Sequence, residues 1–166
     1  MSNPNTFEVT TPTDRSIVMT RRFNAPRAAV FEAWTKAEHV KQWWDPTGVP
    51  LSVCEIDLRP NGAFRWVNSA HGADHTFAGT YREIKAPDRL VFTVGILPGR
   101  PEARATLLFT EARGETTLKM TMDCHSTEDR DTLLKMRVDV GTGRTLENLA
   151  AYVHRVVLPG RKAAQR

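Results

Sequence analysis

Residues 126–160, "STEDRDTLLKMRVDVGTGRTLENLAAYVHRVVLPG", carry the pattern that decides the fold, because they predict a long helix with one apolar face. Apolar side chains recur at steps of three and four, which is the spacing of a helical stripe: Leu146, Leu149, Ala150, Val153, Val156 and Val157. Ser126 or Thr127 before two acidic residues is typical of a helix start, and Pro159-Gly160 predicts its end. Gly141 and Gly143 inside the pattern each cost about 1 kcal/mol relative to alanine. We therefore expect a bend or a close approach there.

The segment before this helix, from about residue 51 to 124, alternates apolar and polar side chains with a period of two. Turn signals divide it: "RPNG" (59–62), "SAHGAD" (69–74), "KAPDR" (85–89), "LPGRP" (97–101) and "EARGE" (111–115). This pattern predicts a meander of antiparallel strands with one continuous apolar face.

Residues 16–43 predict one strand and two short helices. The stretch "SIVMTRRF" (16–23) alternates as a strand does, although Arg21 interrupts its apolar face. A helix whose stripe includes Trp34 follows, and a shorter helix is expected over 36–43.

We expect residues 1–15, which are polar, to form a flexible arm, residues 16–158 to form one domain, and residues 159–166 to form a basic tail. A curved antiparallel sheet wrapped around the long helix buries both apolar faces, so the predicted class is α+β. Such a sheet rarely fills its own interior. A cavity between sheet and helix is therefore expected.

The composition is ordinary for a globular domain: of 166 residues, 40% are hydrophobic and 25% are charged. No apolar run approaches the roughly 20 residues of a membrane span, and the N-terminus lacks the basic and apolar segments of a signal peptide. We therefore expect a cytoplasmic protein. The net charge of +4 is scattered along the chain, so no nucleic-acid partner is predicted.

The polar residues form no catalytic or metal-binding pattern. The available metal ligands lack the spacing of a site, so neither a metal nor a cofactor is predicted: Cys54, His71, His75, Asp123, Cys124 and His125. The two cysteines are expected to be free thiols. General acid–base residues are harder to exclude and none is favoured: Glu55, Asp57, His75, Tyr81, Asp123 and Arg144.

Four stretches resemble a known family and occur in its order: "RRFNAPRAAVFEAWTKAEHVKQWWDP" (21–46), "CEIDLRPNGAFRW" (54–66), "GTYREIKAPDRLVFT" (79–93) and "GTGRTLENLAAYV" (141–153). Over about residues 16–157 the chain is similar to homologues of the activator of the heat shock protein 90 ATPase, a family within the START-like superfamily. The resemblance implies a helix-grip (START-like, Bet-v-1-like) fold with a deep apolar pocket under the C-terminal helix. It is specific for the fold and carries no catalytic signature.

The resemblance also places the tryptophan pair of "HVKQWWDP" (39–46) at the end of the second short helix. Either Trp43 and Trp44 pin the short helices onto the sheet, or at least one ring contacts a ligand. Where the family usually has Gly-Trp-Gly-Gln, this chain has Gly141, Thr142, Gly143 and Arg144. A guanidinium bordering the pocket would favour a larger or anionic ligand, whereas one facing solvent would imply nothing.

The leading hypothesis is a protein that binds a small hydrophobic or amphipathic molecule in this cavity. The predicted ligand-binding residues are Trp34, Trp44, Phe64, Trp66, Phe77, Phe92, Met120, Met122, Val140 and Arg144. One alternative is an enzyme of the cyclase, dehydratase or hydrolase kind acting on a polyketide-like or aromatic substrate, and another is a co-chaperone of heat shock protein 90. A homodimer through a sheet edge or through the Trp43–Trp44 corner is compatible with the sequence.

Overall fold

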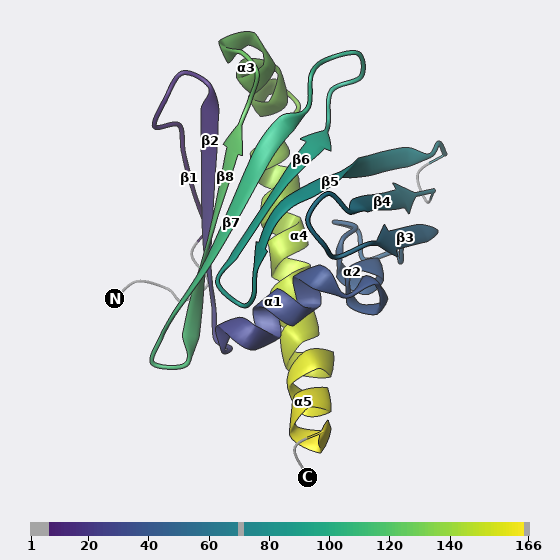
Figure 1. Ribbon diagram of the computed structural model, residues 1–166, viewed down its shortest axis with the longest axis vertical. Helices are drawn as coiled ribbons and strands as arrows, with labels where there is room; N and C mark the ends of the chain where they lie inside the picture. Colours follow the sequence, from purple (N-terminus) through teal and green to yellow (C-terminus); the bar gives the residue numbers. More distant parts are fainter. Residues whose placement is uncertain (1–6, 70–71, 165–166) are drawn as a thin grey trace.

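A computed structural model describes residues 7–69 and 72–164, which form one curved antiparallel sheet and a series of helices along its concave side (Figure 1). The strands are β1 (Phe7–Thr10), β2 (Ser16–Phe23), β3 (Val53–Ile56), β4 (Ala63–Asn68), β5 (His75–Lys85), β6 (Arg89–Gly95), β7 (Ala103–Ala112) and β8 (Glu115–Asp123). The helices are α1 (Arg27–Thr35), α2 (Ala37–Trp43), α3 (Thr127–Lys135), α4 (Val138–Tyr152), the π-helical segment η1 (Val153–Val157) and α5 (Leu158–Ala164).

The strand order of the sheet is β1-β2-β8-β7-β6-β5-β4-β3, and every neighbouring pair is antiparallel. Strands β3 to β8 are the predicted meander, and α1 and α2 are the two predicted short helices. Arg113 and Gly114 both have positive φ, 55° and 76°, so the two-residue loop between β7 and β8 is a type I′ hairpin turn. The predicted helix-grip α+β class is confirmed.

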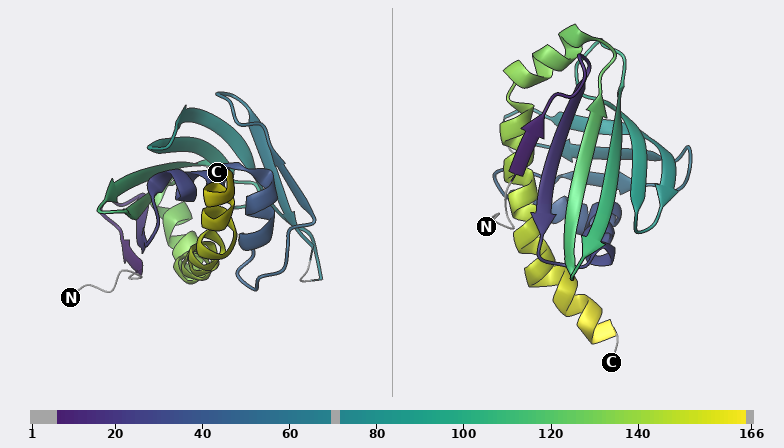
Figure 2. Two further views of the ribbon diagram at one scale, coloured as in Figure 1. Left: turned by 90° about the horizontal axis from the view of Figure 1, so that it is seen from below. Right: turned by 90° about the vertical axis from the view of Figure 1, so that its left-hand side faces the viewer.

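The sheet curls around α4 and η1, and α5 continues the same helical rod beyond the end of the sheet (Figure 2). Helix α1 packs between η1 and β7, and α2 packs against α4, so the two short helices cover one end of the concave face. Helix α3 packs against the start of α4 and lies at the opposite end (Figure 1).

The sequence did not predict β1. Phe7–Thr10, expected to belong to a flexible arm, forms an edge strand whose residues pair with β2, with Phe7 opposite Arg21. Its ring also reaches α4, where a Cβ on Gly143 would lie 3.2 Å from Phe7 Cδ1. The close approach expected at one of the two helix glycines is therefore the approach of β1.

The long helix also differs from the prediction at two places. It is broken before α4, because Arg137 has a left-handed backbone (φ 60°, ψ 43°). It does not end at Pro159-Gly160 but continues as α5. Proline removes a hydrogen bond and crowds the preceding turn, and the wider π-helical turn of η1 just before it gives the ring room. Ser126 caps α3 by accepting from the Asp129 N–H at 3.1 Å, as predicted.

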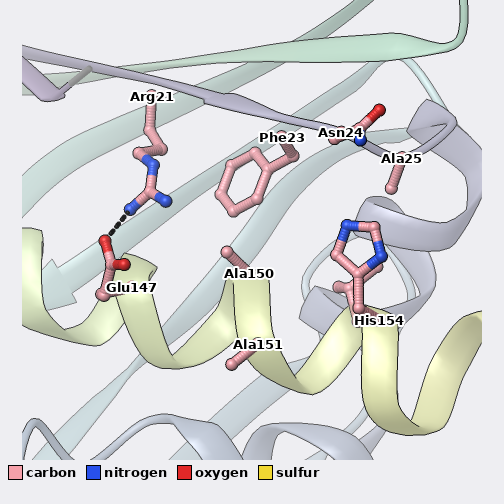
Figure 3. Close-up of a pocket in the computed structure, with 9 residues that line it drawn as sticks. Arg21, Phe23, Asn24, Ala25, Glu147, Ala150, Ala151 and His154 are labelled. Atoms are coloured by element: carbon pink, nitrogen blue, oxygen red, sulfur yellow. Dashed lines mark hydrogen bonds and ion pairs between the residues drawn. The ribbon is translucent and has the colours of Figure 1, made fainter. Parts of the chain in front are cut away.

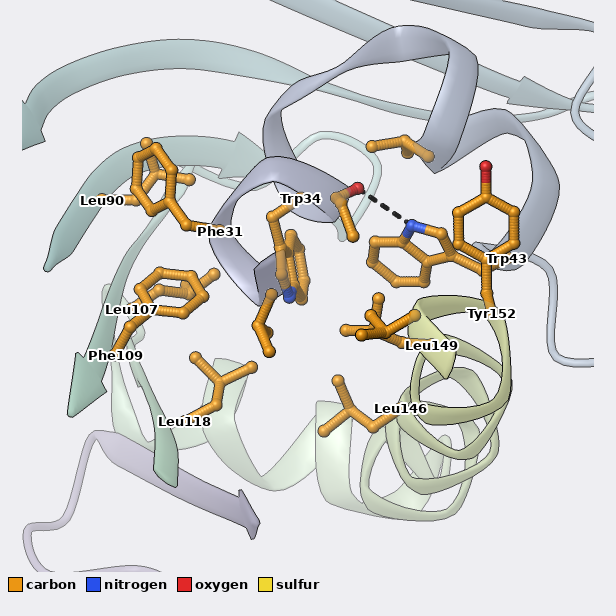
Figure 4. Packing of buried hydrophobic residues seen from close by; sticks show 14 of the residues in the cluster. Phe31, Trp34, Trp43, Leu90, Leu107, Phe109, Leu118, Leu146, Leu149 and Tyr152 are labelled. Atoms are coloured by element: carbon orange, nitrogen blue, oxygen red, sulfur yellow. Dashed lines mark hydrogen bonds between the residues drawn. The ribbon is translucent and has the colours of Figure 1, made fainter. Parts of the chain in front are cut away.

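The inward-facing residues of β7 become smaller along the strand, from Phe109 through Leu107 to Ala105 and Ala103. At Phe109 and Leu107 the space under the sheet is filled, since Phe109 meets the ring of Phe31 edge-on at 5.3 Å (Figure 4). We call the part of the concave face around Leu107 and Phe109 the closed end, and the part around Ala103 and Ala105 the cavity end.

Candidate ligand-binding cavity

A cavity of about 310 Å³ lies between α4 and the cavity end of the sheet. The sheet contributes Met19, Phe92, Ala105, Met120 and Met122 to its wall. Ala105 pairs with Phe92 on one neighbouring strand and with Met122 on the other. A small side chain thus lies between two large ones, and the space it does not fill is at the centre of the wall. Methionine side chains are flexible and fill irregular space incompletely. The cavity is thus a consequence of the taper along β7.

Helix α4 contributes Gly141, Thr142, Thr145 and Leu146 to the opposite wall. Apart from the backbone of its own helix, a Cβ at Gly141 would meet no atom of the described residues within 4 Å, so the missing side chain leaves open space. Gly141 therefore enlarges the cavity, whereas Gly143 accommodates β1.

Trp43 and Trp44 have different roles. Trp43 is buried, its indole N–H donates to the carbonyl of Ala33 at 3.0 Å, and its ring meets Trp34 edge-on at 4.9 Å. Trp44 borders the cavity and lies 4.6 Å from the ring of Trp66. Trp43 thus pins α2 onto α1, and Trp44 forms part of the cavity wall. Because both rings lie within the fold, this corner is not an exposed aromatic patch.

Hydrogen bonds hold Trp44 in place from two sides. On one side, Thr145 Oγ1 donates to the carbonyl of Trp44 at 3.1 Å, and Asn148 Nδ2 donates to the carbonyl of Asp45 at 2.8 Å. On the other side, the buried carboxylate of Asp45 accepts from Asn68 Nδ2 at 2.9 Å. The segment after α2 is thereby fastened to both α4 and β4.

The structure brings together most of the predicted ligand-binding residues. Those that line the cavity are Trp34, Trp44, Phe77, Phe92, Met120 and Met122. Phe64 and Trp66 lie outside that lining and pack against Phe77, with ring centroids 5.9 and 5.4 Å away. Whether any of these side chains contacts a ligand stays a prediction.

Val140 and Arg144 are not in the cavity wall, contrary to their predicted place. They border a separate groove on the other side of α4, beside Phe7 of β1. The helical phase explains this correction, because at about 100° per residue Arg144 points about 160° and Val140 about 120° away from the buried Leu146. The same phase could have identified Thr142, one turn before Leu146, as a lining residue. Nothing in the sequence pattern singled out Arg137, which also lines the cavity.

The acid–base candidates lie outside this lining too. His75 is exposed and borders a different groove, of about 410 Å³, on the far side of Trp44 and Phe77. Burial raises the pKa of the free Cys54 thiol from 9.0 to about 11, an effect that the charge of Lys41 opposes. Burial also raises the pKa of Tyr81. Such shifts keep both groups neutral near pH 7.

No group of metal-ligating side chains gathers within residues 7–69 and 72–164, and His71 lies outside these described ranges. In the same ranges, no helix is both long and apolar enough to cross a bilayer.

A further groove, of about 350 Å³, lies between the end of β2 and α4 and contains the buried Arg21 (Figure 3). Arg21 Nη1 forms an ion pair of 2.7 Å with Glu147, whose side chain is 68% exposed. Among the described residues, Nε and Nη2 have no hydrogen-bond partner, and the guanidinium carbon lies 5.5 Å from the centre of the Phe23 ring. Arg21, which interrupts the apolar face of β2 in the sequence, is thus a buried cation that faces α4.

A curved antiparallel sheet closed by a long helix over an apolar cavity defines the class of helix-grip proteins. Residues 24–154 match the model of the family described as "Activator of Hsp90 ATPase homolog 1-like protein". Since this match covers most of the chain, the protein belongs to that family, as the resemblance of its motifs implied.

Solved structures support the fold. A Rhodobacter sphaeroides protein is 20% identical with a TM-score of 0.82, over 91% of this chain and 99% of that chain. A Nitrosomonas europaea protein is 23% identical with a TM-score of 0.79, over 87% and 97% of the two chains. An Arthrobacter aurescens protein is 19% identical with a TM-score of 0.78, over 89% and 91%. No curated protein matches the chain.

Proposed function

We propose that the protein binds a small apolar or amphipathic molecule in the cavity between α4 and the sheet. The observation that carries this proposal is the cavity itself, about 310 Å³ in volume and walled by side chains from both apolar layers of the fold. Small-molecule pockets typically measure about 300–1,000 Å³ and are mainly apolar with a few polar groups. This cavity is at the lower end of that range, which favours a compact ligand.

The chemistry of the wall favours binding over catalysis. Among the described residues that line the cavity there is no carboxylate, imidazole, thiol or amine. General acid–base catalysis needs such a group within hydrogen-bond reach of the substrate. The polar members of the lining are Arg137, Thr142 and Thr145, and the hydroxyl of Thr145 already donates to Trp44. These groups suit orientation of a ligand.

The test is saturable binding of a neutral apolar dye, N-phenyl-1-naphthylamine, followed by its fluorescence and by energy transfer from tryptophan. Trp34 and Trp44 line the cavity, so a dye bound there should quench their emission. The blocking variant is Gly141→Leu, whose side chain projects into open space inside the cavity. The matched control is Gly160→Leu, at a helix position that is also open but lies in α5, away from the cavity.

We expect wild type and Gly160→Leu to bind the dye equally and Gly141→Leu to lose saturable binding. Because leucine favours a helix over glycine, Gly141→Leu should unfold at no lower temperature than wild type, so lost binding would not reflect lost folding. Equal binding by Gly141→Leu and wild type would contradict the proposal.

A further inference from the structure

The exposed members of the cavity lining are Pro46, Met136 and Arg137. They place the opening of the cavity between the segment after α2 and the junction of α3 with α4. Within the described lining, Arg137 is also the one charged side chain. The opening therefore combines apolar surface with a single positive charge.

The fold itself does not call for arginine at position 137. The backbone there is left-handed, a conformation that glycine or asparagine adopts at lower cost. The turn is held by main-chain bonds, since Arg137 N–H donates to Leu134 O at 3.0 Å and Arg137 O accepts from Gly141 N–H at 3.1 Å. The side chain contributes nothing to these bonds.

The guanidinium of Arg137 is available to a ligand. Its side chain is 69% exposed, and its ion pair with Asp139 is long, with 3.5 Å between Nε and Oδ1. Asp139 itself is only 28% exposed, but the 3.5 Å separation makes the pair weak. A guanidinium forms paired hydrogen bonds with carboxylate, sulfonate or phosphate oxygens, so an incoming anion can compete with Asp139.

We propose that the ligand is an amphipathic organic acid, whose apolar body lies in the cavity and whose anionic group meets Arg137 at the opening. This inference rests on the proposed function, because it assigns a charge to the molecule that the cavity binds. The exposed Met136 beside Arg137 covers the apolar part of such a ligand next to its charged end.

The test compares octanoate with 1-octanol, which share a chain and differ in charge, as competitors of bound N-phenyl-1-naphthylamine. We expect octanoate to displace the dye at a concentration about fivefold lower than 1-octanol, the size of effect expected for a partly exposed ion pair. The preference should shrink in high salt.

Three variants locate the effect. Arg137→Asn suits the left-handed backbone and should remove the preference, so that octanoate displaces the dye no better than 1-octanol does. Arg137→Lys should keep part of the preference. Arg144→Asn removes the same charge two turns further along α4, outside the cavity, and should keep all of it.

The outcomes separate the two proposals. Equal displacement by octanoate and 1-octanol, or equal effects of Arg137→Asn and Arg144→Asn, would overturn the assignment of the anion to Arg137 and leave the cavity proposal intact. Failure of the dye and of both competitors to bind wild type would instead overturn the proposed function, and this inference with it.

Discussion

The closed end and the cavity end of the concave face are parts of one sheet, and helices cover both. At the closed end, Leu107 and Phe109 of β7 fill the space beneath the sheet, and at the cavity end Ala105 leaves about 310 Å³ empty. The two ends are separated by a single two-residue step along one strand. The cavity is thus produced by side-chain size within an unbroken sheet.

The largest expected effect tests whether the two ends are packed differently. Leu107 and Met120 face each other on β7 and β8, with Leu107 fully buried and Met120 bordering the cavity. Leu107→Ala should lower the free energy of unfolding by about 3–4 kcal/mol, whereas Met120→Ala should lower it by about 1 kcal/mol, because fewer contacts surround it. Urea denaturation followed by circular dichroism measures both. Similar losses would mean that the cavity end is packed as tightly as the closed end.

The next effect concerns Arg21, which lies on β2 between Met19 at the cavity and Phe23 in the main core. Glu147→Ala leaves the buried guanidinium without its carboxylate and should destabilise the protein by about 1–2 kcal/mol, less than a fully buried pair because Glu147 is exposed.

Arg21→Met is the companion variant and should be neutral or stabilising, since it removes a buried charge whose two other nitrogen atoms find no partner in the described part of the chain. In the Arg21→Met protein, Glu147→Ala should lower the free energy of unfolding only slightly. A large loss of stability in Arg21→Met, measured by the same denaturation, would show that the cation supports the boundary between the two ends.

A smaller effect compares the two glycines of α4. Gly141→Ala should stabilise the protein by up to about 1 kcal/mol, because alanine favours the helix and its methyl group enters open space. Gly143→Ala should give no such gain, because its methyl group would crowd the ring of Phe7. Thermal melting of the two variants measures the difference, and equal gains would mean that β1 moves away from α4 without cost.

The smallest effect concerns the two free thiols. Cys54 packs against the main core and Cys124 belongs to the cluster beyond the cavity, and burial raises the pKa of both. In the unfolded chain Cys54 loses its proton near pH 9, whereas in the folded chain it keeps the proton until about pH 11. The unfolded state then binds fewer protons, so stability is unaffected below pH 9 and falls as the pH rises towards 11.

At pH 9.5 this loss should be less than about 1 kcal/mol, and Cys54→Ala should remove it. Both thiols should react slowly with a disulfide reagent at pH 8, because the thiolate is the reactive form. Fast labelling of Cys54 in the native protein would contradict the partial burial of its thiol.

The sequence predicted the architecture well where side-chain periodicity is strong. The two short helices, the meander and the stripe of α4 all followed from steps of two, three or four residues. Strand β1 alternates in the same way, Phe7 and Val9 against Glu8 and Thr10, but this pattern spans only four residues of an otherwise polar segment and was not recognised as a strand. The break in the helix at Arg137 gave no signal in the sequence, because the residue there is neither glycine nor proline.

For the cavity, strand parity identified the inward side chains but not which of them leave space. The alternation along 103–109 places Ala105 on the same face as Leu107 and Phe109, yet its importance depends on the larger Phe92 and Met122 beside it, which only the strand register reveals. Val140 and Arg144 were placed wrongly, although the phase of α4 excludes them. Arg137 could not be identified as a lining residue, because its position depends on the break between α3 and α4, which the sequence pattern does not indicate.

The hydrogen bonds around Trp44 have a consequence for the rate at which a ligand enters and leaves. That wall is tied to α4 and β4 through Thr145, Asn148 and Asp45, so it cannot swing outward without breaking several bonds at once. The opposite side of the opening, at Met136 and Arg137, is a short turn at the end of a helix. Amide hydrogen exchange should therefore be faster in α3 than in the middle of α4, and local opening of α3 should set the lifetime of the complex.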